Sequence, residues 1–187
     1  MASGTDCAWM AWALRLAQRG LYTTDPNPRV GCVLAHGEEV VGEGFHARTG
    51  GAHAEVEALA IAGARARGAT AYVTLEPCSH HGRTPPCTGA LIEAGVGRVV
   101  YASRDPNPQV SGRGAAALVD AGIEVELLDS AGAESRALNI GYIKRMGAGR
   151  PWIRVKLASS LDGGTALASG ESRWITSDAA RTDVHRW

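Results

Sequence analysis

Residues 77–87 read PCSHHGRTPPC, a segment that holds Cys78 and Cys87 with eight residues between them. Upstream, the tripeptide HAE contains His53 and Glu55. One imidazole and two thiolates form a good ligand set for zinc, which binds cysteine sulfur at about 2.3 Å. The sequence therefore predicts a zinc site whose protein ligands are His53, Cys78 and Cys87.

Three protein ligands indicate a catalytic zinc site, because structural zinc normally has four. Zinc with an open position lowers the pKa of a bound water molecule to about 7. Glu55 can lie beside such a metal only at the first turn of a helix, because residues i and i+2 point about 200° apart in mid-helix. We expect Gly50 and Gly51 to let the backbone approach the metal there. Glu55 would then carry a proton from water to a leaving group, and H-x-E followed by a cysteine pair is the signature of zinc deaminases.

Two plainer interpretations of these residues stay open. The cysteines could be buried packing residues, or a structural zinc site could be closed by His80 or His81 as a fourth ligand. A structural site has no use for Glu55, so we favour the catalytic interpretation. The remaining cysteines, Cys7 and Cys32, fall in a predicted helix and a predicted strand, and we expect both in the core.

Predicted helices and strands alternate around this motif. Helices are expected at 6–19, with Asp6 as the cap, and at 53–67, 87–94, 115–122 and 130–146; strands are expected at 30–35, 39–45, 69–75, 97–103 and 123–128. The first two strands flank the turn HGE and should form a hairpin, and from the second strand onward we expect a parallel arrangement because helices intervene. The alternation predicts an α/β fold in which helices cover both faces of a central sheet.

A second, shorter part follows the motif-bearing one. We expect a first domain over 1–146, a linker GAGRP at 147–151, and the opening of a second domain at 152–187. This last part is predicted to begin with a strand at 152–158 and to end in a helix within 177–187. So few residues cannot bury a core unaided.

The charges of the 187-residue chain balance, with 19 basic and 19 acidic side chains. Without a net positive field, nucleic acid is not expected as the main partner. No apolar run is long enough to span a bilayer and no signal peptide is visible, so we expect a cytoplasmic protein with no membrane partner. Four cysteines in such a protein indicate metal binding or catalysis before disulfides.

Four segments carry a resemblance to a known family: NPRVGCVL, GFHARTGGAHAE, LEPCSHHGRTPPC and DPNPQVSGRG. They resemble the deaminase domain of the bifunctional riboflavin-biosynthesis deaminase–reductases, over nearly all of residues 6–146. The eight residues between the cysteines, where most zinc deaminases have two, are close to diagnostic among deaminase relatives. The resemblance implies a three-layer cytidine-deaminase-like domain with a mixed sheet. It also implies hydrolysis of 2,5-diamino-6-(5-phosphoribosylamino)pyrimidin-4(3H)-one to 5-amino-6-(5-phosphoribosylamino)uracil and ammonia.

The same resemblance implies which side chains contact the substrate. It places Asn27, His46, His80 and Arg83 around the substrate, and Asp105 and Asn107 near the ribose phosphate. The chemistry agrees in part, since an amide both donates and accepts hydrogen bonds and a guanidinium suits a phosphate. Asn27 and Asp105 could equally be turn formers, because both lie beside prolines.

Residues 156–187 resemble the start of the family's reductase domain, a dihydrofolate-reductase-like fold that uses NADPH. The resemblance implies that Ala158 and Trp174 contact NADPH and that Ser172 contacts the substrate, although Trp174 could be a packing aromatic. LDGG departs from the DGR expected there. We expect no reductase activity from these residues alone, and we expect a homo-oligomer because relatives assemble as oligomers. A cytidine or tRNA-adenosine deaminase and a zinc-stabilised interaction module remain alternatives.

Overall fold

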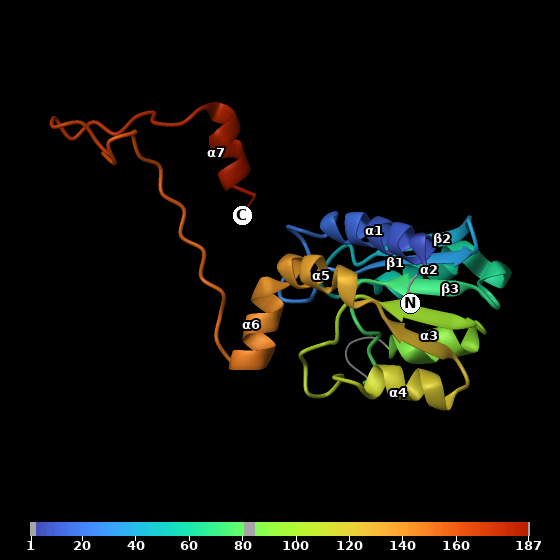
Figure 1. The fold of residues 1–187 in the computed structure, drawn as a ribbon. Helices are drawn as coiled ribbons and strands as arrows, with labels where there is room; N and C mark the ends of the chain where they lie inside the picture. The colour runs from blue at the N-terminus through green and yellow to red at the C-terminus, as the bar shows by residue number, and fades with distance from the viewer. Residues whose placement is uncertain (1–2, 81–84, 187) are drawn as a thin grey trace. The chain divides into compact units, whose positions relative to one another are not determined.

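The computed structural model describes residues 3–80 and 85–186 of the chain (Figure 1). The chain separates into two units, Met1–Trp152 and Ile153–Trp187, each considered by itself. Two residues of the predicted site region, His81 and Arg83, lie outside the described residues. Among the described helices, none combines the length and apolar character needed to cross a membrane.

The first unit contains the elements expected from the sequence. Its strands are β1 (Gly31–His36), β2 (Glu39–Phe45), β3 (Thr70–Val73), β4 (Arg98–Tyr101) and β5 (Glu124–Leu127), and its helices are α1 (Gly4–Gln18), α2 (Ala54–Ala62), α3 (Cys87–Glu93), α4 (Arg113–Asp120), α5 (Gly132–Leu138) and α6 (Ile140–Ala148), with short 3₁₀ turns η1 (Gly63–Ala66) and η2 (Asp129–Ala131). The sheet order is β2-β1-β3-β4-β5. The predicted hairpin is confirmed, because β1 is antiparallel to β2. Since β1 is also antiparallel to β3, while β3, β4 and β5 are mutually parallel, β2 through β5 all run in one direction.

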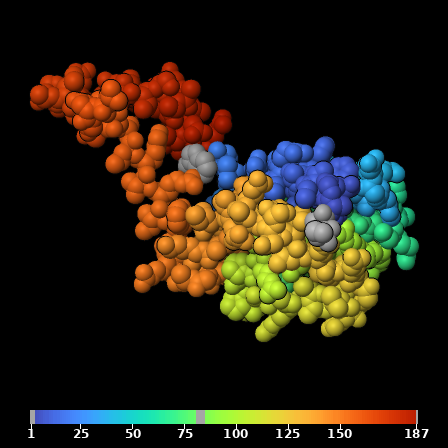
Figure 2. All heavy atoms as spheres, in the orientation of Figure 1, coloured from blue at the N-terminus to red at the C-terminus, as the bar shows by residue number. Residues whose placement is uncertain are grey.

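Helices cover both faces of this sheet, so the predicted three-layer α/β fold is confirmed (Figure 1). Side chains along β1 alternate between two apolar clusters, as a strand buried on both faces requires. Cys32 and Leu34 pack with α2, α3 and α4, whereas Val33 and Ala35 pack with α1 and the α5 side. Figure 2 shows α1 and the segment around α5 side by side on one face of the unit.

The N-terminus of α1 differs from the prediction. Ser3, not Asp6, is the N-cap, and Asp6 occupies the third helical position of a capping box in which each side chain bonds the other residue's backbone N–H. Asp6 is instead drawn into the interior, where its carboxylate accepts hydrogen bonds from Arg98 and the Tyr72 hydroxyl. Among the structural cysteines, Cys32 is buried as expected, but Cys7 is exposed, so its expected place in the core was wrong.

The single helix expected at 130–146 is interrupted. The segment forms η2, α5 and α6, with a break at the fully buried Asn139. Its side-chain oxygen accepts from the backbone N–H of Arg29 at 2.7 Å, and its amide donates to the Arg29 carbonyl at 3.0 Å. These two bonds turn the chain there, and α6 then continues to Ala148, into the segment predicted as a linker.

In the second unit, the helix predicted near the end of the chain is confirmed as α7 (Asp178–Val184), whose N-cap Ser177 accepts from a backbone N–H. The strand expected at 152–158 is not formed. Its alternating apolar residues, Ile153, Val155 and Leu157, are between 73% and 77% exposed. A strand needs a hydrogen-bonded neighbour, and the described residues of 153–187 contain no strand that could provide one.

Candidate metal centre and active site

The three predicted zinc ligands meet at one edge of the sheet. β2, β3 and β4 end at this edge and β1 begins there, because β1 runs opposite to the others. His53 lies after β2 as the N-cap of α2, Cys78 follows β3, and Cys87 is the first residue of α3. The sheet therefore brings together residues that are 34 positions apart in the sequence.

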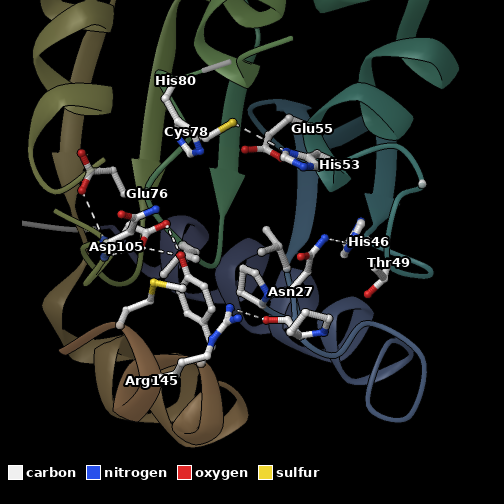
Figure 3. Close-up of a pocket in the computed structure, with 18 of the residues that line it drawn as sticks. Asn27, His46, Thr49, His53, Glu55, Glu76, Cys78, His80, Asp105 and Arg145 are labelled. Atoms are coloured by element: carbon white, nitrogen blue, oxygen red, sulfur yellow. Dashed lines mark hydrogen bonds between the residues drawn. The ribbon is translucent and has the colours of Figure 1, made fainter. Parts of the chain in front are cut away.

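The donor atoms of this cluster fit a zinc ion. The His53 Nδ1 atom lies 3.0 Å from Cys87 Sγ and 3.6 Å from Cys78 Sγ, and all three donor atoms lie within 4.8 Å of one another (Figure 3). Tetrahedral zinc with ordinary Zn–N and Zn–S bond lengths holds such atoms about 3.6 Å apart. His80 is not part of this group among the described residues, which speaks against its closing the site as a fourth ligand.

The local environment favours the thiolate form of Cys78. The backbone N–H of Cys87, at the start of α3, donates to Cys78 Sγ at 3.3 Å. Interaction with the Cys87 side chain, together with His53, lowers the pKa of Cys78 although burial opposes this shift. The neighbouring Cys78 raises the pKa of His53. Sulfur with thiolate character is the form that ligates zinc.

Glu55 lies beside this cluster, as the helix-start geometry predicts. His53 has the extended backbone of an N-cap (φ −75°, ψ 160°), so it and Glu55, two residues on, both border the same cavity. Gly50, at φ 79°, also borders the cavity and turns the chain toward the start of α2. Burial, and secondarily the charge of Cys78, raises the pKa of Glu55 to about 7. The carboxyl group can thus hold or release a proton near neutral pH.

A cavity of about 370 Å³ joins this cluster to most of the predicted substrate contacts (Figure 3). Its lining includes the predicted residues Asn27, His46, His53, Glu55, Cys78, His80, Asp105 and Asn107. In Figure 3, His53, Glu55 and Cys78 lie on one side of the cavity, with Asn27 and His46 on a second side and Asp105 on a third. A volume of this size suits a small molecule rather than a polymer.

Asn27 and His46 form a pair with a defined direction. His46 Nδ1 lies 2.9 Å from the carbonyl of Ala52, which can only accept, so Nδ1 carries the proton. Burial lowers the pKa of His46 and favours its neutral ring, whose Nε2 then accepts from the Asn27 amide at 3.3 Å. Among the described residues, no donor bonds the amide oxygen of Asn27, which can therefore accept from a ligand.

Asp105 and Asn107 are held in a loop after β4. The carboxylate of Asp105 is buried and accepts from the hydroxyl of Tyr142, at 2.8 and 3.1 Å to its two oxygens, and from the backbone N–H of Asn107 at 2.8 Å. Burial raises the pKa of Asp105. On the other side of the cavity, His80 has a buried Nδ1 without a hydrogen-bond partner among the described atoms. That ring nitrogen is suited to bond a ligand in the cavity.

Comparison with known proteins identifies the family of this chain. Residues 3–103 match the family described as the cytidine and deoxycytidylate deaminase zinc-binding region, and residues 151–187 match the RibD C-terminal domain. The chain is 47% identical over 146 residues to the diaminohydroxyphosphoribosylamino-pyrimidine deaminase of Buchnera aphidicola subsp. Schizaphis graminum. The aligned region covers 78% of this chain and 99% of that relative. The chain belongs to the RibD deaminase family.

Longer RibD proteins are also similar to this chain. It is 62% identical over 181 residues to Escherichia coli RibD, covering 96% of this chain and 48% of that protein. The solved structure of Acinetobacter baumannii RibD superposes with a TM-score of 0.91 at 56% identity, covering 98% of this chain and 51% of that one. The chain thus spans about half the length of these longer RibD proteins. The family predicted from the four motif segments is confirmed.

The cavity of this RibD-family chain has walls that sequence reasoning missed. Tyr142, Arg145 and Met146 of α6 line the cavity. Glu76, which directly precedes the segment 77–87, also lines it. The spacing 142, 145 and 146 is that of one helix face, a signal that was available but pointed equally to core packing. Arg145 donates to the carbonyl of Pro26, another lining residue, at 2.9 Å (Figure 3).

The residues predicted for the reductase part lie in the second unit. Ala158, Ser172 and Trp174 border one shallow hollow within 153–187. Trp174 is 70% exposed, and the guanidinium of Arg181 lies 4.1 Å from the centre of its indole ring. Trp174 is therefore not a packed core aromatic in this unit.

Proposed function

We propose that this chain is a zinc-dependent deaminase of 2,5-diamino-6-(5-phosphoribosylamino)pyrimidin-4(3H)-one, forming 5-amino-6-(5-phosphoribosylamino)uracil and ammonia. The observation that carries the proposal is that the donor cluster of His53, Cys78 and Cys87 meets a small-molecule cavity, which His53, Cys78 and the buried Glu55 line. The relative whose length is almost completely matched is named for this activity.

His53, Cys78 and Cys87 would hold the zinc ion. The donor set, its spacing and the lowered pKa of Cys78 support this assignment. When bound, zinc supplies a Lewis acid that makes water nucleophilic at neutral pH. Three protein ligands are the number found in catalytic sites.

Glu55 moves the proton that the reaction requires. The oxygen of water bonds to the ring carbon that carries the 2-amino group, and the bond from that carbon to nitrogen breaks. As the carbon–oxygen bond forms, Glu55 carries one proton of the attacking water to the adjacent ring nitrogen. It then carries the second proton to the departing amino group, so that ammonia leaves and a ring carbonyl beside a ring N–H remains. A pKa of about 7 suits both halves of this transfer, because the group must accept and then donate.

The remaining predicted residues would orient the substrate. The Asn27 oxygen, directed by His46, is suited to accept from an amino or ring N–H of the pyrimidine. The unpartnered Nδ1 of His80 would bond another polar group of the base. Asp105 and Asn107 would face the ribose, since a carboxylate accepts from hydroxyls but repels phosphate.

The phosphate would then lie toward cationic side chains. Arg83 is our candidate from the family resemblance, and it lies outside the described residues. For the reductase part, we propose that Ala158 and Trp174 contact NADPH and Ser172 the reductase substrate when a complete domain is present. The match of residues 151–187 to the RibD C-terminal domain supports this.

A direct test is ammonia release by the purified, zinc-loaded chain. We expect turnover of the phosphoribosyl diaminopyrimidine, one zinc per chain, and turnover of cytidine slower by at least about 10²-fold, the discrimination that a site built for specific polar groups provides. Equal turnover of cytidine would favour the cytidine-deaminase alternative. A zinc-loaded chain that releases ammonia from neither compound would contradict the proposal.

A further inference from the structure

Glu76 is a buried carboxylate with an unusual set of partners. Its side chain is 3% exposed, and it accepts hydrogen bonds from four backbone N–H groups of one later segment. Oε2 accepts from Asp105 at 3.3 Å and from Gly112 at 3.1 Å. Oε1 accepts from Gly114 at 3.1 Å and from Ala115 at 3.2 Å. A buried charge is tolerable in a protein only with partners of this kind.

Three of these N–H groups belong to the start of α4. Gly112 is the N-cap of that helix and has no side chain with which to cap it. Glu76, from a distant part of the chain, takes over this role, and the helix dipole favours its negative charge. The fit is close, because a Cβ atom at Gly114 would lie 2.0 Å from the carbonyl oxygen of Pro77.

The same carboxylate also fixes the substrate loop. One oxygen, Oε2, bonds both Asp105 and Gly112, which are the two ends of the loop that carries Asn107. Glu76 itself lies two residues before Cys78, one of the predicted zinc ligands. Glu76 thus connects the segment that carries Cys78 to both ends of the loop that carries Asn107.

We propose that Glu76 is a positioning residue, which places Asp105 and Asn107 relative to the metal cluster and so determines the affinity for the ribose phosphate part of the substrate. This inference rests on the proposed deaminase function. The chemistry at the base is left to Glu55 and the cluster, so the effect of Glu76 should be on binding rather than on turnover.

The test is the variant Glu76→Gln, which keeps the size of the side chain. Its NH₂ group cannot accept, so at least one pair of the four N–H groups loses its acceptor. We expect the KM for the phosphoribosyl substrate to rise roughly 10-fold or more, the scale of one lost hydrogen bond to a charged group, with kcat within about 3-fold and zinc content unchanged. Turnover of 2,5,6-triaminopyrimidin-4-one, which lacks the ribose phosphate, should change by less than about 3-fold.

Asp6→Asn is the matched control. Asp6 is also a buried carboxylate with several hydrogen bonds, but it does not line the cavity. The Asp6→Asn substitution should lower the melting temperature. It should leave the KM unchanged both for the phosphoribosyl substrate and for 2,5,6-triaminopyrimidin-4-one. A normal KM in Glu76→Gln, or the same KM shift in Asp6→Asn, would overturn the inference, and so would an equal loss on both substrates.

A measurement on the unmodified protein covers the case in which Glu76→Gln does not fold. The backbone amides of Asp105, Gly112, Gly114 and Ala115 should exchange with deuterium at least about 100-fold more slowly than the exposed amide of Val155. Exchange of these four amides at the rate of Val155 would overturn the inference. If the wild-type chain had no deaminase activity, that result would count against the proposed function. It would not bear on the four hydrogen bonds of Glu76, which the exchange measurement tests separately.

Discussion

Replacing Glu55 with glutamine should separate zinc binding from turnover. The side chain is 3% exposed, and glutamine preserves its size while removing its ability to accept a proton and return it. The other carboxylates that line the cavity cannot take over. Glu76 already accepts four backbone hydrogen bonds, and Asp105 is bonded to Tyr142 and Asn107.

The expected loss is that of an acid–base group without a substitute. Such groups contribute about 10²–10⁴-fold, or about 2.7–5.5 kcal/mol in activation free energy. Because neither neighbouring carboxylate is free, we expect kcat to fall by at least about 10³-fold. KM should change little, since Glu55 acts on the transferred proton rather than on the ribose phosphate part.

The assay is ammonia release measured together with zinc per chain by elemental analysis. Glu57→Gln is the control, because Glu57 lies on the same helix turn but is exposed. It should retain normal activity and zinc. If Glu55→Gln keeps more than about a tenth of the wild-type kcat with a full complement of zinc, the role assigned to Glu55 is wrong.

Three further substitutions test the metal centre and the fold. Cys78→Ser should reduce zinc content and abolish turnover, because a hydroxyl is a far poorer zinc ligand than a thiolate; full zinc occupancy after dialysis would count against the cluster. Asp6→Asn should lower stability at pH 7 by about 1–3 kcal/mol, since Arg98 loses its buried partner but keeps Glu124 and Glu126. The hydrogen bond with Arg98 holds the pKa of Asp6 well below its usual range, so this contribution is present above pH of about 4 and is lost as pH falls further. Urea melts should therefore show the two proteins converging in strong acid, and a difference that persists unchanged there would refute the linkage. Asn139→Ala should cost about 1–3 kcal/mol, because both backbone groups of Arg29 lose their partner, and a thermal melt unchanged from wild type would show that water replaces the amide.

The chemistry of the metal centre was predictable because it resides in residue type and short spacing. An imidazole and two thiolates have few other uses together. His53 and Glu55 could both face one metal only at a helix start, which is where the structure has them. Alternating helices and strands likewise predicted the layers. The break at Asn139 was not predictable, because it depends on hydrogen bonds to Arg29, 110 residues away.

The strand predicted at 152–158 illustrates the limit of a local pattern. Alternation of Ile153, Val155 and Leu157 is correct for a strand, but a strand forms only where a neighbour accepts its backbone hydrogen bonds. The same limit hid the insertion of β1 between β2 and β3, since strand order depends on which edges pair rather than on the residues of one strand.

The sequence by itself thus determined the family and predicted the proposed zinc ligands and proton carrier, because these depend on the chemistry of single side chains and their spacing. Only the tertiary structure decided what surrounds them: α6 as a wall of the cavity, the direction of the Asn27 amide through His46, and the capping of α4 by Glu76. Each of these is a contact between segments far apart in the chain. Buried polar groups cannot form hydrogen bonds with water, so they must bond other protein groups. Which groups these are depends on which segments the fold brings close together.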